Sequence, residues 1–287
     1  MYNEDAQTTK NSSIKADNNV RYTNKSDSGN PHLHYVENRV QGADNPLISV
    51  IMPVYKLSKL VTYSIEAVEK IMKANRYNYE IIIVDDGSPD DTYNYAVMMP
   101  QNSSIKVYRL PRNMGKGFAL LYGFKKSRGD VVVFFDGDLD IDPRQIHLLV
   151  NTLRSNGVDI AITSKWHPES RTIATPLRKF LSRSFYALAR LLLGLKVSDT
   201  QTGAKAFRRE VLEDIAGCLT VKRYAFDVEL LTAATARGYR IAEVPALWRI
   251  KLTSRFRARE IARMLIDLMA VAYRHRVKKQ HINSAKQ

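Results

Sequence analysis

Short runs of β-branched and aromatic residues alternate with longer amphipathic segments from Pro46 onward, and this alternation limits the possible folds more than any other feature. Five such runs occur, at Leu47–Val54, Tyr79–Val84, Ile105–Leu110, Val131–Phe135 and Val158–Thr163. Nearly continuous apolar strands that alternate with helices are typical of a parallel sheet with both faces covered. We therefore predict an α/β class with a mostly parallel sheet covered by helices.

The first 46 residues differ from the rest of the chain. They are rich in Asn, Ser, Asp and Thr and show no apolar periodicity. Such a segment buries too little hydrophobic surface to offset the entropy lost on ordering. We expect a disordered polar tail at residues 1–46, one α/β domain at residues 47–250 and a C-terminal basic helix within residues 251–287. A single cysteine, Cys218, excludes an internal disulfide framework.

The net charge of +15 is concentrated in two segments. Residues 165–210 hold ten basic and three acidic residues, and residues 249–287 hold eleven and two. Both contain a predicted amphipathic helix, at Pro176–Leu195 and at Arg257–Lys279. Cationic helices with an apolar face suit an anionic lipid surface, although a solvated basic face on a core-packed helix is the simpler alternative.

The sequence also indicates whether a membrane or a nucleic acid is a partner. No apolar stretch reaches the roughly 18 residues that a membrane span needs, so we expect a cytoplasmic protein that is peripheral on a membrane. No recognised nucleic-acid module is present, and we expect no nucleic-acid partner.

Polar, glycine-rich segments follow three of the first four strands. Ligands of open α/β sheets bind beyond the carboxyl ends of the strands, so these segments are candidate site residues. The segments after the four strands are Met52–Tyr55, Asp85–Asp91, Arg112–Gly117 and Asp136–Asp140. There is no P-loop, no complete dinucleotide fingerprint and no zinc-type spacing of His and Cys.

Asp136 and Asp138 flank one glycine directly after a buried strand. Carboxylates two residues apart can share a hard divalent cation, and Asp140 extends this candidate metal set. The alternative is a loop of solvated acids. Asp85 or Asp86 is a candidate partner for a base or ribose, or else a cap for the next helix. Lys116 lies between two glycines, where its ammonium can meet a phosphate.

These segments, in this order and spacing, resemble the family 2 glycosyltransferases. The later segments Ser198–Phe207 and Ala225–Glu229 resemble the polyprenyl-phosphate hexose synthases, particularly the dolichyl-phosphate glucosyltransferases. The resemblance covers roughly residues 47–260. It implies the GT-A fold and a metal-dependent hexosyltransferase. Three positions depart from the family's usual pattern, namely Lys56-Leu57, Asp140 and Lys165.

The resemblance also implies roles for individual positions. The nucleotide-sugar would contact Pro53, Tyr55, Asp85, Asp86, Lys116 and Asp136. Mg²⁺ or Mn²⁺ would be held by Asp136, Asp138 and Asp140. The catalytic and acceptor-side positions are Asp138, Asp199, Lys205, Arg208 and Glu229. The candidates for the acceptor phosphate are Arg249, Lys251, Ser254 and Arg255.

The expected reaction transfers a hexose, with inversion, from UDP-glucose or GDP-mannose to a polyprenyl (dolichyl) phosphate. A lipid phosphate is already anionic near neutral pH and needs alignment more than deprotonation. A sugar-hydroxyl acceptor would instead need a general base, with Asp199 or Asp227 as the candidate. Two other classes remain open, an inactive sugar-nucleotide or lipid-binding protein and a nucleotidyltransferase.

Overall fold

The computed structural model describes residues 21–22, 45–99, 104–155, 157–170, 176–221, 225–247 and 258–276. Its elements run in the order β1 (Arg21–Tyr22), β2 (Leu47–Val54), α1 (Val61–Ala74), β3 (Asn78–Asp85), α2 (Thr92–Met98), β4 (Ile105–Arg109), α3 (Lys116–Lys126), β5 (Val131–Phe135), α4 (Gln145–Arg154), β6 (Ile160–Ser164), α5 (Pro176–Leu193), β7 (Ala204–Arg208), α6 (Arg209–Ala216), α7 (Phe226–Ala236), β8 (Ile241–Pro245) and α8 (Ala258–Arg276).

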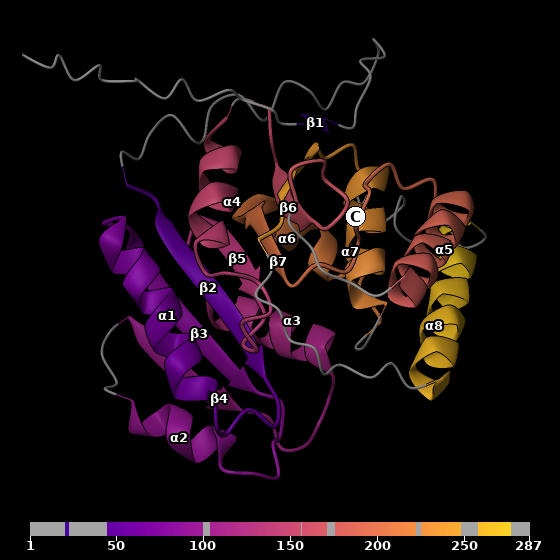
Figure 1. Ribbon diagram of the computed structural model, residues 1–287. Helices are drawn as coiled ribbons and strands as arrows, with labels where there is room; N and C mark the ends of the chain where they lie inside the picture. The colour runs from indigo at the N-terminus through magenta and orange to yellow at the C-terminus, as the bar shows by residue number, and fades with distance from the viewer. Residues whose placement is uncertain are drawn as a thin grey trace, which may run out of the picture.

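A single eight-stranded sheet organises the described chain, in the order β1-β8-β6-β7-β5-β2-β3-β4 (Figure 1). All strands run in one direction except β7, which is antiparallel to β5 and β6, and β1, which is antiparallel to β8. The five predicted strands and the α/β class are confirmed. Arg21 and Tyr22 pair with β8 although they fall inside the predicted disordered tail, and the rest of residues 1–44 lies outside the described residues.

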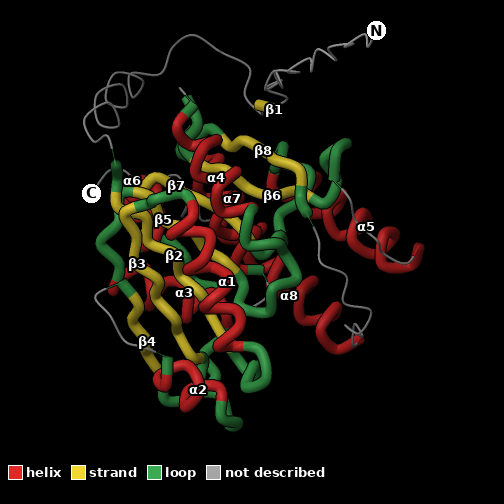
Figure 2. The backbone as a smooth tube through the Cα atoms, turned by 60° about the vertical axis from the view of Figure 1, so that its left-hand side comes forward, coloured by secondary structure: helices red, strands yellow, loops and turns green. Residues whose placement is uncertain are grey.

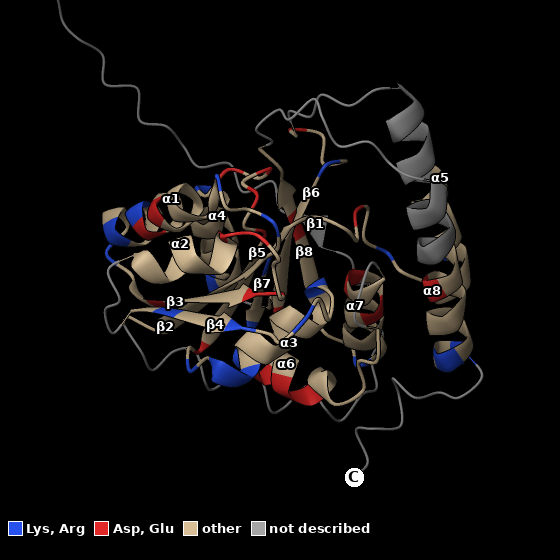
Figure 3. Cartoon of the chain, turned by 90° about the horizontal axis from the view of Figure 1, so that it is seen from below, with Lys and Arg blue, Asp and Glu red and all other residues tan. Residues whose placement is uncertain are grey.

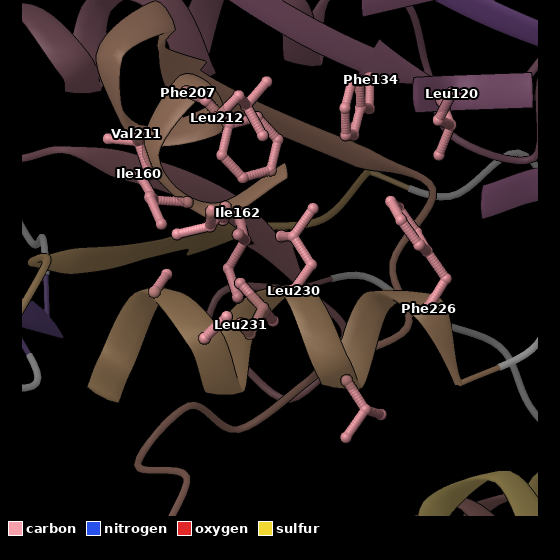
Figure 4. Close-up of a cluster of buried hydrophobic side chains, with 14 of the residues drawn as sticks. Leu120, Phe134, Ile160, Ile162, Phe207, Val211, Leu212, Phe226, Leu230 and Leu231 are labelled. Atoms are coloured by element: carbon pink, nitrogen blue, oxygen red, sulfur yellow. The ribbon is translucent and has the colours of Figure 1, made fainter. Parts of the chain in front are cut away.

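Helices cover both faces of the sheet (Figure 2). One core contains apolar residues of α1, α2 and α4 against one face, and the other contains residues of α3, α5, α6, α7 and α8 on the opposite face. Helix α7 packs Leu230 and Leu231 toward Ile160 and Ile162 of β6 (Figure 4). Because apolar residues of the central strands point alternately to both cores, the strands read as continuous apolar runs.

The two basic amphipathic helices lie side by side outside α7 (Figure 1). Helix α8 buries Leu268, Val271 and Ala272, whereas Ile266 and Met269 are 67% and 56% exposed. The apolar stripe read from the sequence is therefore divided between the core and the surface. Among the described residues, no helix is both long and apolar enough to cross a bilayer.

Candidate functional site

The carboxyl ends of β2, β3, β4 and β5 meet at one edge of the sheet, and the loop before β7 joins them there. The register pairs Phe135, the last residue of β5, with Ala204, the first residue of β7. The backbone N–H of Asp136 donates to the carbonyl of Gly203 at 2.9 Å. The antiparallel pairing thus places the loop before β7 directly beside the acidic loop after β5.

Lys116 and Asp136 form the closest charge pair of this edge. The Lys116 ammonium lies 2.8 and 2.9 Å from the two carboxylate oxygens of Asp136. Burial alone would lower the pKa of Lys116, but Asp136 and Asp227 outweigh it and the pKa is raised. Burial, with the nearby Asp138 charge, raises the pKa of Asp136 despite Lys116. Both side chains stay about one-third exposed, at 35% and 31%, so a ligand can reach them.

The next carboxylates lie on a strained turn. Leu139, between Asp138 and Asp140, has a φ of 56°, a left-handed value that non-glycine residues rarely adopt. The N–H of Asp140 donates to the carboxylate of Asp138 at 3.1 Å. Within the described ranges, no group of three or more His, Cys, Asp or Glu side chains is placed to hold a metal. The three carboxylates of Asp136, Asp138 and Asp140 are thus not assembled as a metal centre in the described structure, and the role of Asp140 as a metal ligand stays a prediction.

Gly203 leaves room for the Asp136 carboxylate. A Cβ atom at Gly203 would lie 2.4 Å from Asp136 Oδ2. Asp136 and Asp138 supply hard oxygen donors, and the Asp136 side chain is 31% exposed. Such donors fit a divalent cation whose other ligands come from a diphosphate. Asp136 and Asp138 are thus the first candidate metal ligands.

Tyr55 and Lys56 provide an open surface after β2. Tyr55 is 39% exposed, and the Lys56 ammonium lies 5.4 Å from the centre of its ring. An exposed aromatic ring beside a strand end suits stacking with a planar base. Pro53 lies within β2, directly before this surface.

Asp85 is fully buried at the end of β3. Its carboxylate accepts hydrogen bonds from the N–H of Ser88 and pairs with Arg109 at 3.3 Å. Asp85 therefore fixes its own loop, and its contact with the nucleotide stays a prediction. The N–H of Thr92, the first residue of α2, donates to the carboxylate of Asp90 at 3.3 Å, so the capping alternative applies to Asp90 and not to Asp85 or Asp86.

Asp86 holds the glycine-rich loop rather than a helix end. Its carboxylate accepts hydrogen bonds from the N–H groups of Met114, at 2.7 Å, and Gly115, at 2.9 Å. The same loop leads directly into α3, whose first residue is Lys116. Asp86 thus sets the position of Lys116, a role that the sequence pattern did not indicate.

Asp199, in the loop before β7, pairs with Lys165. Its carboxylate accepts the N–H of Lys165 at 3.1 Å and lies 3.6 Å from the Lys165 ammonium. Glu243 of β8 accepts hydrogen bonds from the N–H groups of Ser198 and Asp199. Burial raises the pKa of Glu243. Sequence analysis missed Glu243, although a lone carboxylate inside an apolar strand was its signal.

Lys205 is buried instead of facing an acceptor. Its side chain is 1% exposed, and its ammonium donates to the Thr202 carbonyl and to Asp227 at 2.9 Å. Burial lowers the pKa of Lys205, while Lys205 and Lys116 outweigh burial at Asp227 and lower its pKa. The prediction that Lys205 contacts the acceptor is wrong because both of its partners are internal.

Arg208 lies at the opposite edge of the sheet. It pairs with Val131, the first residue of β5, and its guanidinium donates to the carbonyls of Val158 and Leu153 at 2.9 Å. Because β7 is antiparallel, the strand carries Arg208 away from Asp136. The prediction that Arg208 lies near the acceptor is therefore wrong.

Glu229 is fully buried and binds structural partners. Its carboxylate accepts hydrogen bonds from the N–H groups of Thr220 and Val221, and from Arg274 of α8 at 2.9 Å. A pocket of about 680 Å³ lies nearby, between residues 112–114, residues 220–221 and α8. Glu229 thus joins α7 to α8, and its predicted catalytic role is not supported.

The four candidates for the acceptor phosphate, Arg249, Lys251, Ser254 and Arg255, lie outside the described residues. They remain predictions.

Comparison with known proteins agrees with this arrangement. Residues 49–216 match the model of glycosyl transferase family 2. Dolichyl-phosphate beta-glucosyltransferase ALG5C of Trichomonas vaginalis is 34% identical over 77% of this chain and 69% of its own length. Dolichyl-phosphate beta-glucosyltransferase of Dictyostelium discoideum is 34% identical over 74% of this chain and 69% of its own. Glycosyltransferase AglD of Haloferax volcanii is 32% identical over 71% of this chain, which spans only 33% of that protein.

Solved structures with the same fold include glucosyl-3-phosphoglycerate synthase from Mycobacterium tuberculosis. Its complex with Mg²⁺ and uridine diphosphate gives a TM-score of 0.62 at 23% identity, over 79% of this chain and 78% of that one. Its complex with Mn²⁺, uridine diphosphate and glucosyl-3-phosphoglycerate gives 0.61 at 24% identity, over 79% of both chains. This likeness confirms the predicted GT-A fold. The family match and the two dolichyl-phosphate glucosyltransferase relatives show that the chain belongs to glycosyl transferase family 2 and is a glycosyltransferase related to the dolichyl-phosphate glucosyltransferases.

Proposed function

We propose that the protein transfers a hexose from a nucleotide-sugar to a polyprenyl phosphate at a membrane surface. UDP-glucose is the favoured donor and GDP-mannose the second candidate. The observation that carries the proposal is the open edge where Asp136, Asp138 and Lys116 meet beyond the parallel strands. The names of the relatives, dolichyl-phosphate beta-glucosyltransferase, support the choice of sugar and acceptor.

The donor would lie along this edge. The exposed ring of Tyr55 offers a face to the base, and Lys116 offers a positive charge to the diphosphate. Asp136 and Asp138 would hold Mg²⁺ or Mn²⁺, which supplies positive charge against the departing nucleoside diphosphate.

An anionic acceptor suits the described site better than a hydroxyl. The two carboxylates that could act as a base are already paired, Asp199 with Lys165 and Asp227 with Lys205. A carboxylate whose pKa is lowered, as for Asp227, accepts a proton poorly. A phosphate needs no base, so its oxygen can attack the anomeric carbon directly. The bond from that carbon to the diphosphate breaks as the new bond forms, which inverts the configuration.

The outer face of α8, defined as Leu265, Ile266, Met269 and Tyr273, supports the membrane location. These side chains are 38%, 67%, 56% and 55% exposed. Asp267 is the only charged residue from Leu265 to Tyr273, and Arg274 and Arg276 follow (Figure 3). Arg274 turns inward to Glu229, so the basic residue next to this apolar face is the exposed Arg276. An exposed apolar face with a basic residue beside it suits the headgroup region of an anionic bilayer, where a lipid phosphate is presented. We place this surface at the cytoplasmic face of the membrane.

The test is transfer of radiolabel by the purified protein. UDP-glucose or GDP-mannose, labelled in the sugar, is incubated with dolichyl phosphate and Mn²⁺, and the product is extracted with butanol. We expect label from UDP-glucose in the organic phase, lost in Asp138→Asn and retained in Asp91→Asn, whose carboxylate is exposed.

The outcomes separate the parts of the proposal. Donor hydrolysis without extractable label would overturn the lipid acceptor and leave a sugar hydroxyl as the alternative. Label that depends on GDP-mannose would change the donor. No turnover of either donor would overturn the proposal as a whole.

A further inference from the structure

Four buried or half-buried charges alternate in sign along one line of contacts, Asp136, Lys116, Asp227 and Lys205. Lys116 lies 2.8 Å from Asp136 Oδ1 and 3.8 Å from Asp227 Oδ2. Asp227 Oδ1 in turn accepts a hydrogen bond from Lys205 at 2.9 Å. Lys116 therefore stands between two carboxylates, nearer to one than to the other.

Four different elements bring these residues together. Lys116 begins α3, Asp136 follows β5, Lys205 lies in β7 and Asp227 is the second residue of α7. The starts of α3 and α7 touch, because a Cβ atom at Gly117 would lie 2.5 Å from the ring of Phe226. This close approach places Asp227 within reach of the Lys116 ammonium.

The two outer side chains of this line are more exposed than the two inner ones. Lys116 and Asp136 are 35% and 31% exposed, Asp227 is 10% and Lys205 is 1%. The outer pair can meet a ligand, whereas the inner pair is enclosed by protein. Only the outer pair can thus change partners when a ligand binds.

In the described state, Lys116 occupies both oxygens of Asp136. A divalent cation can use the Asp136 carboxylate only if Lys116 withdraws at least in part, because two cations on the same oxygens repel each other. Asp227, whose side chain is only 10% exposed, offers a second oxygen to Lys116 at 3.8 Å.

We propose that Lys116 exchanges its partner Asp136 for Asp227 when the donor binds. This exchange releases the Asp136 carboxylate for a divalent cation. Lys205 is the positioning residue of the exchange. It occupies Asp227 Oδ1, leaves Oδ2 toward Lys116, and keeps Asp227 from drawing Lys116 away before the donor arrives. This inference rests on the proposed metal and nucleotide-sugar site.

The test measures Mn²⁺ binding rather than turnover. Free Mn²⁺ is counted by electron paramagnetic resonance during titration of the full chain in the presence of UDP. The paired variant Asp227→Asn with Lys205→Met removes one charge of each sign, so the net charge and the long-range field stay nearly constant. Lys116→Met is then made in both the natural and the paired background, which completes a double-mutant cycle.

The exchange predicts coupling between the two changes. In the paired variant Lys116 has only Asp136, so Mn²⁺ binds roughly three- to tenfold more weakly, as expected when a contact between charges in a partly buried site is altered. Lys116→Met removes the contact with the diphosphate of UDP in both backgrounds, but it also frees Asp136, and this second effect is larger in the paired background. The change in Mn²⁺ affinity caused by Lys116→Met is therefore more favourable in the paired variant than in the natural protein. An equal change in both backgrounds, which is also what a merely loosened paired variant would give, or a paired variant that binds Mn²⁺ as the natural protein does, would overturn the exchange.

Failure of the exchange can be distinguished from failure of the proposed reaction. A natural protein that binds no Mn²⁺ with UDP overturns both the metal site and the exchange. A natural protein that binds Mn²⁺ but transfers no sugar to lipid overturns the proposed reaction and leaves the exchange to be decided by the cycle.

Discussion

The carboxylate of Asp86 accepts a hydrogen bond from the backbone N–H of Gly115 at 2.9 Å, which ties the end of β3 to the start of α3. The same carboxylate binds the N–H of Met114 at 2.7 Å. Since Lys116 follows Gly115 directly, the position of the Lys116 charge depends on an acidic side chain that follows β3.

Asp86→Ala should weaken donor binding more than it slows transfer at saturating donor. The change leaves two N–H groups without their acceptor and lets the loop before Lys116 move. We expect KM for the donor to rise by about tenfold, since hydrogen bonds to charged groups contribute about 1.5–3 kcal/mol. Steady-state kinetics measure the effect, with Asp91→Ala as the control in the same loop. A kcat loss without a KM change would contradict this role.

Gly203→Ala should remove activity while the fold persists. The new methyl group would lie 2.4 Å from Asp136 Oδ2, so the carboxylate must turn away from its place. Displacement of a catalytic group by about 1 Å can cost on the order of a hundredfold in rate. The matched control is Gly217→Ala at the end of α6, where nothing lies within 4 Å of the new atom. The melting temperatures of both variants are measured to show that each is folded. Equal activities of the two folded variants would contradict the crowding at Asp136.

Glu229→Gln should lower stability and leave the chemistry intact. Glu229 is fully buried and pairs with Arg274, whose side chain is 21% exposed, so the variant leaves a partly buried guanidinium without its counter-charge. We expect a loss of about 2–4 kcal/mol in the free energy of unfolding, as for other broken buried pairs. Urea unfolding measures this loss, and activity is compared well below the melting temperature. Unchanged stability with lost activity would restore the catalytic role expected from the sequence.

The residues whose predicted positions were wrong show that a linear motif lacks information on strand direction and helix face. The apolar strands and the acidic loops could be predicted, because continuous apolar runs and charged strand ends follow from a covered parallel sheet. The antiparallel direction of β7 could not be predicted from the sequence. Arg208 lies three residues after Lys205 on this strand, which places it about 10 Å away. Asp227 and Glu229 are two residues apart on a helix, so their side chains point in directions about 160° apart. Only one of them can face the site.

Glu80→Gln should destabilise the protein at neutral pH and much less in acid. Burial alone would raise the pKa of Glu80, but hydrogen bonds from Ser49, the Arg128 N–H and Lys106 outweigh it and lower the pKa. A depressed carboxyl pKa gives stability that is present above the unfolded value, about 4.3, and lost as pH falls through the folded value. Urea unfolding at pH 7, 4 and 3 should show the difference between the natural protein and the variant shrinking with pH. A difference that is constant across this range would contradict the ionised state of Glu80.

Ile266→Glu with Met269→Glu should release the protein from membranes without harming the site. Both residues lie on the outer face of α8, and a carboxylate at each removes apolar contact and is repelled by anionic lipid. Each side chain contributes up to about 1.5–3 kcal/mol when fully buried, so partial insertion predicts at least a tenfold loss of binding. Flotation with vesicles of phosphatidylcholine and phosphatidylserine measures it. Met98→Glu is the matched control, because Met98 is 77% exposed at the end of α2, a helix on the opposite face of the sheet. Equal flotation of the α8 variant and the natural protein would exclude this face as the membrane contact, and equal loss in Met98→Glu would show that the attraction depends on net charge alone.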